Sequence, residues 1–190
     1  MKWKLDRKHL VISGIYSEID HFLLNYPIPD GEDADIIALH LELDTQPPPS
    51  IKRFGNLRWL RIISSRWTAI SPEIFPRKLE TLIIESSSFE SITDFFANIL
   101  QLRDLKSISF FVNTIKYTDH RFDTTAFPLL NNIDIHIAHT IPPDLLMLIP
   151  SEWTHTYKQT TFGNHYKWQK NTTQKLPTYT TAPIYNPTIL

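Results

Sequence analysis

A nine-residue phrase that occurs twice constrains the fold of this chain more than any other feature. Residues 57–65 read LRWLRIISS and residues 79–87 read LETLIIESS, so the second copy starts 22 residues after the first. Both copies have apolar residues at positions 1, 4 and 6. The same frame fits residues 36–44, 105–113 and 130–138, which gives five copies at spacings of 21 to 26 residues. A chain built in this way is expected to repeat one structural unit.

The spacing within each copy predicts a short strand. Side chains of a strand alternate between two faces, so positions 4 and 6 share one face and positions 3, 5 and 7 share the other. A unit of this kind buries its apolar face only by stacking on its neighbours. The sequence therefore predicts parallel strands that start near residues 37, 58, 80, 106 and 131, with positions 4 and 6 in the core.

The pattern resembles the leucine-rich repeat, L-x-x-L-x-L-x-x-N/C, which has a period of 20 to 29 residues. At position 9 Asn113 matches the family, and Asp44, Ser65 and Ser87 are other short polar residues that can bond to the backbone. Ala138 cannot, which is typical of a degenerate last repeat. The resemblance implies an α/β fold, a leucine-rich-repeat solenoid with parallel strands, an N-terminal cap and an irregular C-terminal cap.

The expected organisation has three parts. Residues 1–30 form an N-terminal cap or irregular first repeat, because HLVISG has a strand pattern and SEIDHFLLN a helical one with Ser17 as N-cap. Residues 31–150 hold about five leucine-rich repeats. Residues 151–190 form a polar, aromatic C-terminal cap and tail, interpreted as irregular strands over the last repeat or as a basic aromatic arm for a partner. The last dozen or so residues are expected to be weakly held.

The segments that return the chain from one strand to the next are expected to differ in structure. After the copy at residue 57, two prolines exclude a long helix, and Ile70, Ile74 and Phe75 are expected to pack inward. After the copy at residue 79, a helix is expected to carry Phe95, Phe96, Ile99 and Leu100 into the core. Longer spacing thus goes with a helical return.

Composition excludes several classes of protein. The chain of 190 residues contains no cysteine, which excludes disulfides, a thiol nucleophile and a zinc–thiolate site. The net charge of −1 provides no general attraction to nucleic acid or to an anionic membrane. No stretch reaches the ~18 apolar residues of a membrane span. We expect a soluble cytoplasmic protein without a membrane association.

The histidines give weak evidence for chemistry. His136 and His139 lie in an alternating pattern that directs the two rings to opposite faces, so no metal site is expected there. His120 stands between Asp119 and Asp123, but no nucleophile motif or glycine-rich loop accompanies it. An enzyme built on His120 or His136 would have no mechanism that the sequence supports. We expect a protein that is not an enzyme and that needs no cofactor.

The outward face of the predicted strands is the most informative candidate site. Trp59, Ile63, Ile83 and Phe111 are apolar residues on a face that should meet water, and in leucine-rich-repeat proteins this face commonly binds a partner. Such a patch surrounded by charges is typical of a protein interface. The alternative is that the C-terminal segment covers it. The candidate binding residues are His40, Glu42, Trp59, Arg61, Ile63, Ile83, Glu85, Phe111, Asp134 and His136.

Two functional hypotheses follow from these patterns. The first is a non-catalytic protein-binding module that holds a protein partner on its strand face; adaptors and bacterial immunity-type proteins are roles that the resemblance permits. The second is a protein that contacts nucleic acid through its C-terminal tail, where lysines alternate with Tyr157, Tyr166 and Trp168 and could bind phosphates while the rings stack on bases. The charge balance makes nucleic acid the less favoured partner.

Overall fold

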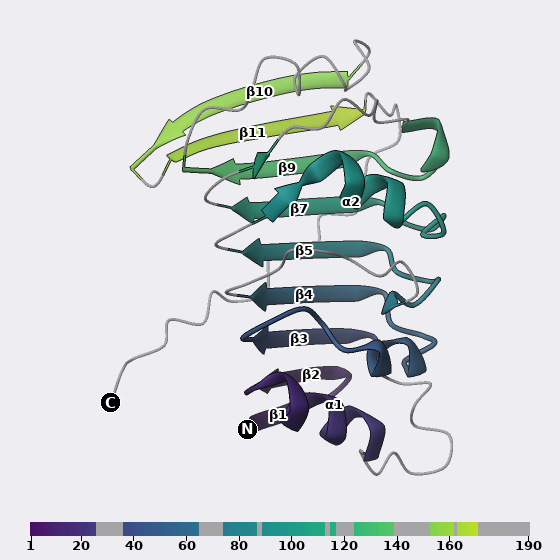
Figure 1. The fold of residues 1–190 in the computed structure, drawn as a ribbon. Helices are drawn as coiled ribbons and strands as arrows, with labels where there is room; N and C mark the ends of the chain where they lie inside the picture. Colours follow the sequence, from purple (N-terminus) through teal and green to yellow (C-terminus); the bar gives the residue numbers. More distant parts are fainter. Residues whose placement is uncertain are drawn as a thin grey trace.

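One sheet of nine strands organises the described part of the chain (Figure 1). The computed structural model describes residues 1–25, 36–64, 74–86, 89–112, 115–116, 124–138, 153–161 and 163–170. In spatial order the strands are β1 (Lys2–Asp6), β2 (His9–Ser13), β3 (Ala38–Leu43), β4 (Trp59–Ser64), β5 (Thr81–Ser86), β7 (Ser107–Val112), β9 (Asn132–Ile137), β11 (Gly163–Lys170) and β10 (Trp153–Thr160). The sheet is open, with β1 and β10 at its edges.

The repeated phrases form neighbouring parallel strands. Strands β3, β4, β5, β7 and β9 each begin one residue after the predicted start, and each pairs in parallel with the next. Equivalent positions face one another, so that Leu60 pairs with Leu39 on one side and with Leu82 on the other. The prediction of five parallel strands is confirmed. The protein is a mainly sheet-forming α/β protein with few helices.

The apolar positions of the repeats build the core. All side chains at positions 4 and 6 of the five strands are at most 1% exposed, and those at position 1 are buried too. Short helices lie over this face of the sheet, among them α1 (Tyr16–Asn25), the 3-10 helix Pro49–Arg53 and α2 (Ile92–Asn98) (Figure 1). Each fully buried Leu, Ile or Phe contributes about 1.5–3 kcal/mol. The opposite face of the sheet is left for contacts with solvent or a partner.

The N-terminal segment extends the parallel series by one strand. Strand β2 pairs in parallel and in register with β3, and β1 adds an antiparallel edge. Helix α1 buries Ile19 and Leu23. The predicted N-cap, Ser17, is wrong, because the helix already begins at Tyr16. The Tyr16 N–H donates instead to Oδ1 of Asp44, at 2.9 Å, so a position-9 residue of the first repeat binds the end of this helix.

In the described parts of the return segments, one residue departs from its pattern; Ile70 lies outside the described residues. Ile74 and Phe75 are buried, and α2 brings Phe95 and Phe96 into the core. Leu100 is 43% exposed, which corrects the expectation that it packs inward. Helix α2 ends at Asn98, so the 3.6-residue period no longer directs Leu100 to the core.

The C-terminal cap is more regular than expected. Strands β10 and β11 form an antiparallel hairpin of two eight-residue strands, and β11 pairs with β9. Trp153, Tyr166 and Trp168 bury their rings at this end of the core, as the cap interpretation requires. The strands are regular because alternation in β11 gives it one apolar face. The expected weakly held end lies outside the described residues. Of the helices in the described ranges, none is long and apolar enough to cross a membrane.

Candidate functional site

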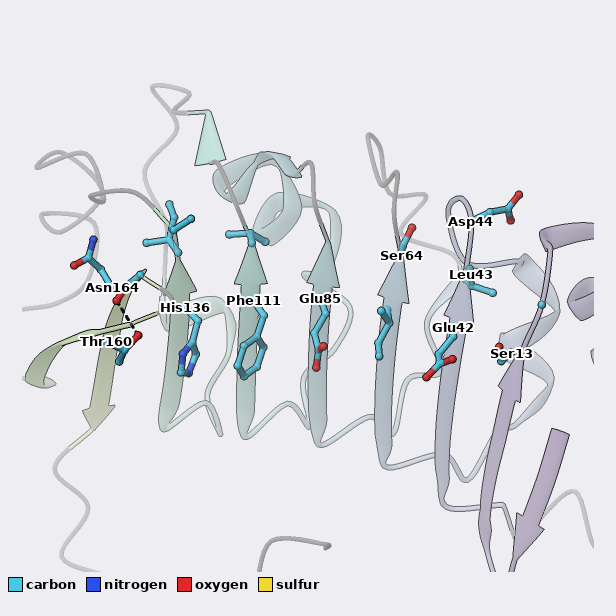
Figure 2. Close-up of a pocket in the computed structure, with 16 residues that line it drawn as sticks. Ser13, Glu42, Leu43, Asp44, Ser64, Glu85, Phe111, His136, Thr160 and Asn164 are labelled. Atoms are coloured by element: carbon cyan, nitrogen blue, oxygen red, sulfur yellow. Dashed lines mark hydrogen bonds between the residues drawn. The ribbon is translucent and has the colours of Figure 1, made fainter. Parts of the chain in front are cut away.

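The face opposite the core presents its side chains in rows. Because the parallel strands pair in register, residues at equivalent positions are neighbours across the sheet. The row nearest the carboxyl ends of the strands consists of Glu42, Ile63, Glu85, Phe111 and His136. Figure 2 shows four of these, Glu42, Glu85, Phe111 and His136, extending from the same face of neighbouring strands. Antiparallel pairing of β11 with β9 adds His165 beside His136.

A groove of about 1030 Å³ follows this row from β2 to β11 (Figure 2). It lies at the carboxyl ends of the parallel strands. Half of the ten predicted site residues line it: Glu42, Ile63, Glu85, Phe111 and His136. The other five are not among its lining residues: His40, Trp59, Arg61, Ile83 and Asp134.

The groove is acidic. Its lining includes the carboxylates of Glu42, Asp44 and Glu85, whereas no Lys or Arg is among the described residues that line it. Arg61 reaches Glu85 from the neighbouring row, with Nη2 at 2.6 Å from Oε1, and neutralises that charge locally. The Glu42 side chain is 47% exposed, and the His40 ring lies 3.7 Å from its Oε1. Glu42 and Asp44 thus place two carboxylates at one end of the groove.

Apolar side chains interrupt these charges. Ile63 stands between Glu42 and Glu85 in the pairing, and Phe111 follows Glu85 on β7. The Phe111 side chain is 39% exposed. One side of its ring stacks on the His136 imidazole, with centroids 4.2 Å apart. Phe111 is therefore held in place while part of its ring remains open to the groove.

A cluster of titratable groups surrounds His136, which lines the part of the groove on β9. The imidazoles of His136 and His165 stack with centroids 3.9 Å apart. Their Nε2 atoms lie 3.1 Å and 2.7 Å from Oδ1 of Asp134. Burial by itself would raise the pKa of the Asp134 carboxyl, but its hydrogen bond with His136 and the charges of both imidazoles outweigh burial and hold this pKa below its usual range.

Sequence reasoning missed His165. The expectation of no metal site compared His136 with His139, which lies outside the described residues, as does His120. His165 reaches the cluster because β11 pairs with β9, 31 residues after Asp134 in the chain. The alternation of GNHYKWQK, with Tyr166 and Trp168 inward, is a signal that places His165 on the outward face once the strand is recognised.

The remaining predicted residues occupy the rows farther from the groove. Trp59 is partly buried, and its ring meets the His9 ring edge-on at 5.4 Å. Arg61 is the next residue of β4 on the same face as Trp59, and its register partners are His40 and Ile83. The described C-terminal hairpin does not cover Trp59, because it joins the sheet edge beyond β9, whereas Trp59 lies on β4. Whether residues 171–190 cover it concerns a segment outside the described ranges.

His40 predicts a pH dependence of stability. Burial, followed by the nearby Arg61 charge, lowers the pKa of His40 from 6.5 to about 4, against the opposing effect of Glu42. Below pH 6.5 the His40 imidazole is protonated in the unfolded chain but stays neutral in the folded chain. The free energy of unfolding therefore falls as the pH drops from 6.5 to about 4. In His40→Gln this fall in the free energy of unfolding is expected to be smaller by about 1–3 kcal/mol. Denaturant melts of parent and variant across this pH range measure it; identical slopes would contradict it.

The C-terminal hairpin offers less to nucleic acid than its sequence suggests. Tyr166 and Trp168 are 5% and 4% exposed, so their rings are packed in the core and cannot stack on bases. Among the three rings expected to do so, only Tyr157 is exposed, and its hydroxyl donates to Asn164. This burial removes most of the stacking surface that the nucleic-acid hypothesis requires.

Comparison with protein-family models, with curated proteins and with solved structures gives no match for this chain. Its function is therefore inferred from the geometry of the strand face.

Proposed function

We propose that this protein is a non-catalytic binding module, a short solenoid of leucine-rich-repeat type whose strand-end groove holds an extended segment of a protein partner. The observation that carries this proposal is the alternation of acidic and apolar side chains along the groove. In register, Glu42, Ile63, Glu85 and Phe111 follow one another across four strands. Neighbouring strands lie about 4.8 Å apart, so the four groups span a length that an extended peptide can match.

The chemistry of the groove favours a basic and apolar segment. A Lys or Arg side chain of the partner would meet Glu42, since Glu85 is already paired with Arg61. A bulky apolar side chain would cover Ile63 and the open part of Phe111. The lining carries carboxylates without Lys or Arg among its described residues, so an acidic segment would be repelled. A rigid aromatic ring beside charged groups is typical of the residues that dominate binding energy.

A cytoplasmic location belongs to this proposal, because the chain has no cysteine to support a disulfide-stabilised secreted domain.

Selection from a library of random linear peptides tests the proposal. Peptides enriched on the parent protein are expected to contain Lys or Arg beside bulky apolar residues. Their binding is expected to weaken as salt is added, because salt screens the contacts with the exposed carboxylates. Enrichment of acidic peptides, or of none, would reject the groove as a site for this class of partner.

Substitution of Phe111 locates the bound peptide. We expect Phe111→Ala to weaken binding of a selected peptide by about 10-fold or more, because truncation of a central aromatic contact commonly costs that much. Leu100→Ala is the matched control, since Leu100 is about as exposed but lies in the return segment after α2. Calorimetric titration of both variants decides the point. Equal affinities for parent and Phe111→Ala would remove Phe111 from the site.

A further inference from the structure

Three ligand-type side chains converge where the parallel sheet meets the antiparallel hairpin. Asp134 and His136 lie on the outward face of β9, and His165 lies directly opposite His136 on β11. Each of the three side chains offers one oxygen or nitrogen atom, and these three atoms lie within 4.8 Å of one another. Both imidazoles direct Nε2 to the same oxygen, Oδ1 of Asp134. Side chains from two strands thus point to one place.

The observed separations are close to those of a coordinated metal. Zinc binds nitrogen and oxygen ligands at about 2.0–2.2 Å, so two ligands of a tetrahedral site are about 3.3 Å apart. The two imidazole nitrogens lie 2.7 Å and 3.1 Å from the carboxylate oxygen. A small outward rotation of each side chain would admit an ion between the three atoms. The imidazoles would then lose their stacked arrangement and carry their remaining protons on Nδ1.

We propose that Asp134, His136 and His165 bind one divalent ion of the zinc class. Two imidazoles and one carboxylate suit zinc and other late first-row metals, whereas magnesium and calcium prefer oxygen ligands alone. Three protein ligands leave one coordination position, which zinc sites with exchangeable ligands keep for water or for an incoming group. Because His136 also lines the groove, that position is next to the groove.

The surroundings of the cluster favour a site that is held but accessible. Each of the three side chains is partly exposed, between 20% and 34%, so an ion can enter. Phe111 packs against one side of His136 and limits its movement. Lys167 is the register partner of Asp134 on β11, so one positively charged residue stands beside the cluster. Binding would cross-link β9 to β11.

Titration of the full chain with zinc chloride, prepared without a polyhistidine tag, tests the site. We expect one equivalent to bind and to raise the melting temperature. His165→Gln keeps a side chain that can donate to Asp134 but removes a ligand, so its affinity is expected to fall about 100-fold or more. Asp134→Asn keeps the shape of the side chain and removes its charge, and its affinity for zinc is expected to fall by a similar factor. Cobalt bound in place of zinc is expected to show the visible absorption of a tetrahedral nitrogen and oxygen site.

Lys167→Gln is the matched control, because it alters the same row of β11 without removing a ligand. It is expected to bind zinc at least as tightly as the parent, and circular dichroism of all variants verifies that they are folded. Failure of the folded parent to bind an equivalent of zinc would overturn the proposal. Retention of the parent's affinity by both ligand variants would also overturn it, since the ion would then bind elsewhere. Neither outcome depends on peptide binding in the groove.

Discussion

Phe110→Ala is expected to lower the free energy of unfolding by about 3–5 kcal/mol, whereas Phe111→Ala is expected to lower it by about 1 kcal/mol or less. The two residues are adjacent on β7 but face opposite sides of the sheet. Phe110 is fully buried and makes edge-on ring contacts with Phe95, at 5.2 Å, and with Phe96, at 5.9 Å. Its truncation removes these contacts and leaves a cavity that rigid neighbours fill only in part.

Denaturant melts of both variants under one set of conditions measure the difference. Phe111 is 39% exposed and stacks on His136, so the same chemical change at the next position leaves no enclosed cavity and serves as the matched control. Similar losses in the two variants would mean that β7 does not separate a core face from an open face. That result would also remove the basis for placing Phe111 in the groove.

The fold could be predicted where a pattern and a periodicity agreed. In the phrase LETLIIESS, Leu79, Leu82 and Ile84 fall at positions 1, 4 and 6, and a two-residue side-chain period leaves few other ways to bury them together. Repetition of the phrase then determines the neighbours, because equivalent apolar positions pack best in register. The one-residue offset of the strand starts reflects only where the ladder of hydrogen bonds begins.

The edges of the sheet had weaker signals. Strand β1 is exposed along its whole length, so the short alternation of polar and apolar residues in KWKLD was its only sequence signal. The threonine-rich β10 is exposed after Trp153, and its hairpin lacks an Asn-Gly type of turn. These strands follow from pairing with a neighbour already in place. Ser17 illustrates the same limit, because a distant carboxylate, Asp44, competes with a local capping rule and binds the helix end.

The candidate site also has a part that the repeats predict and a part that they do not. The row from Glu42 to Phe111 was predictable, since each member sits at position 7 of a repeat and the repeats pair in register. This row lines the groove because position 7 lies at the carboxyl ends of the strands. The titratable cluster needed one more fact, the antiparallel pairing of β11 with β9, which places His165 beside His136. Nothing in the repeat pattern carries that information, because the hairpin is outside the repeats.

Gly163→Ala is expected to detach the C-terminal hairpin and to lower the free energy of unfolding by about 3 kcal/mol or more. Gly163 begins β11 with a φ of +129°, a conformation that residues with a side chain rarely adopt. A Cβ at this position would also lie 2.7 Å from Cα of Ala138 and would overlap the carbonyl oxygen of Ile137. Both obstacles are backbone atoms of the neighbouring chain segment, so the contact cannot be relieved by turning a side chain.

Gly55→Ala is the matched control, because a Cβ there would meet no atom within 4 Å and the backbone is not in the left-handed region. That variant is expected to stay within about 0.5 kcal/mol of the parent. Hydrogen exchange separates local from global damage: the amides of β10 and β11 should lose protection in Gly163→Ala before those of β4 and β5, which lie in the middle of the sheet. Parent-like protection of β11 in that variant would show that Gly163 is not needed for the junction. In that case another residue would have to account for the close approach of β11 to β9.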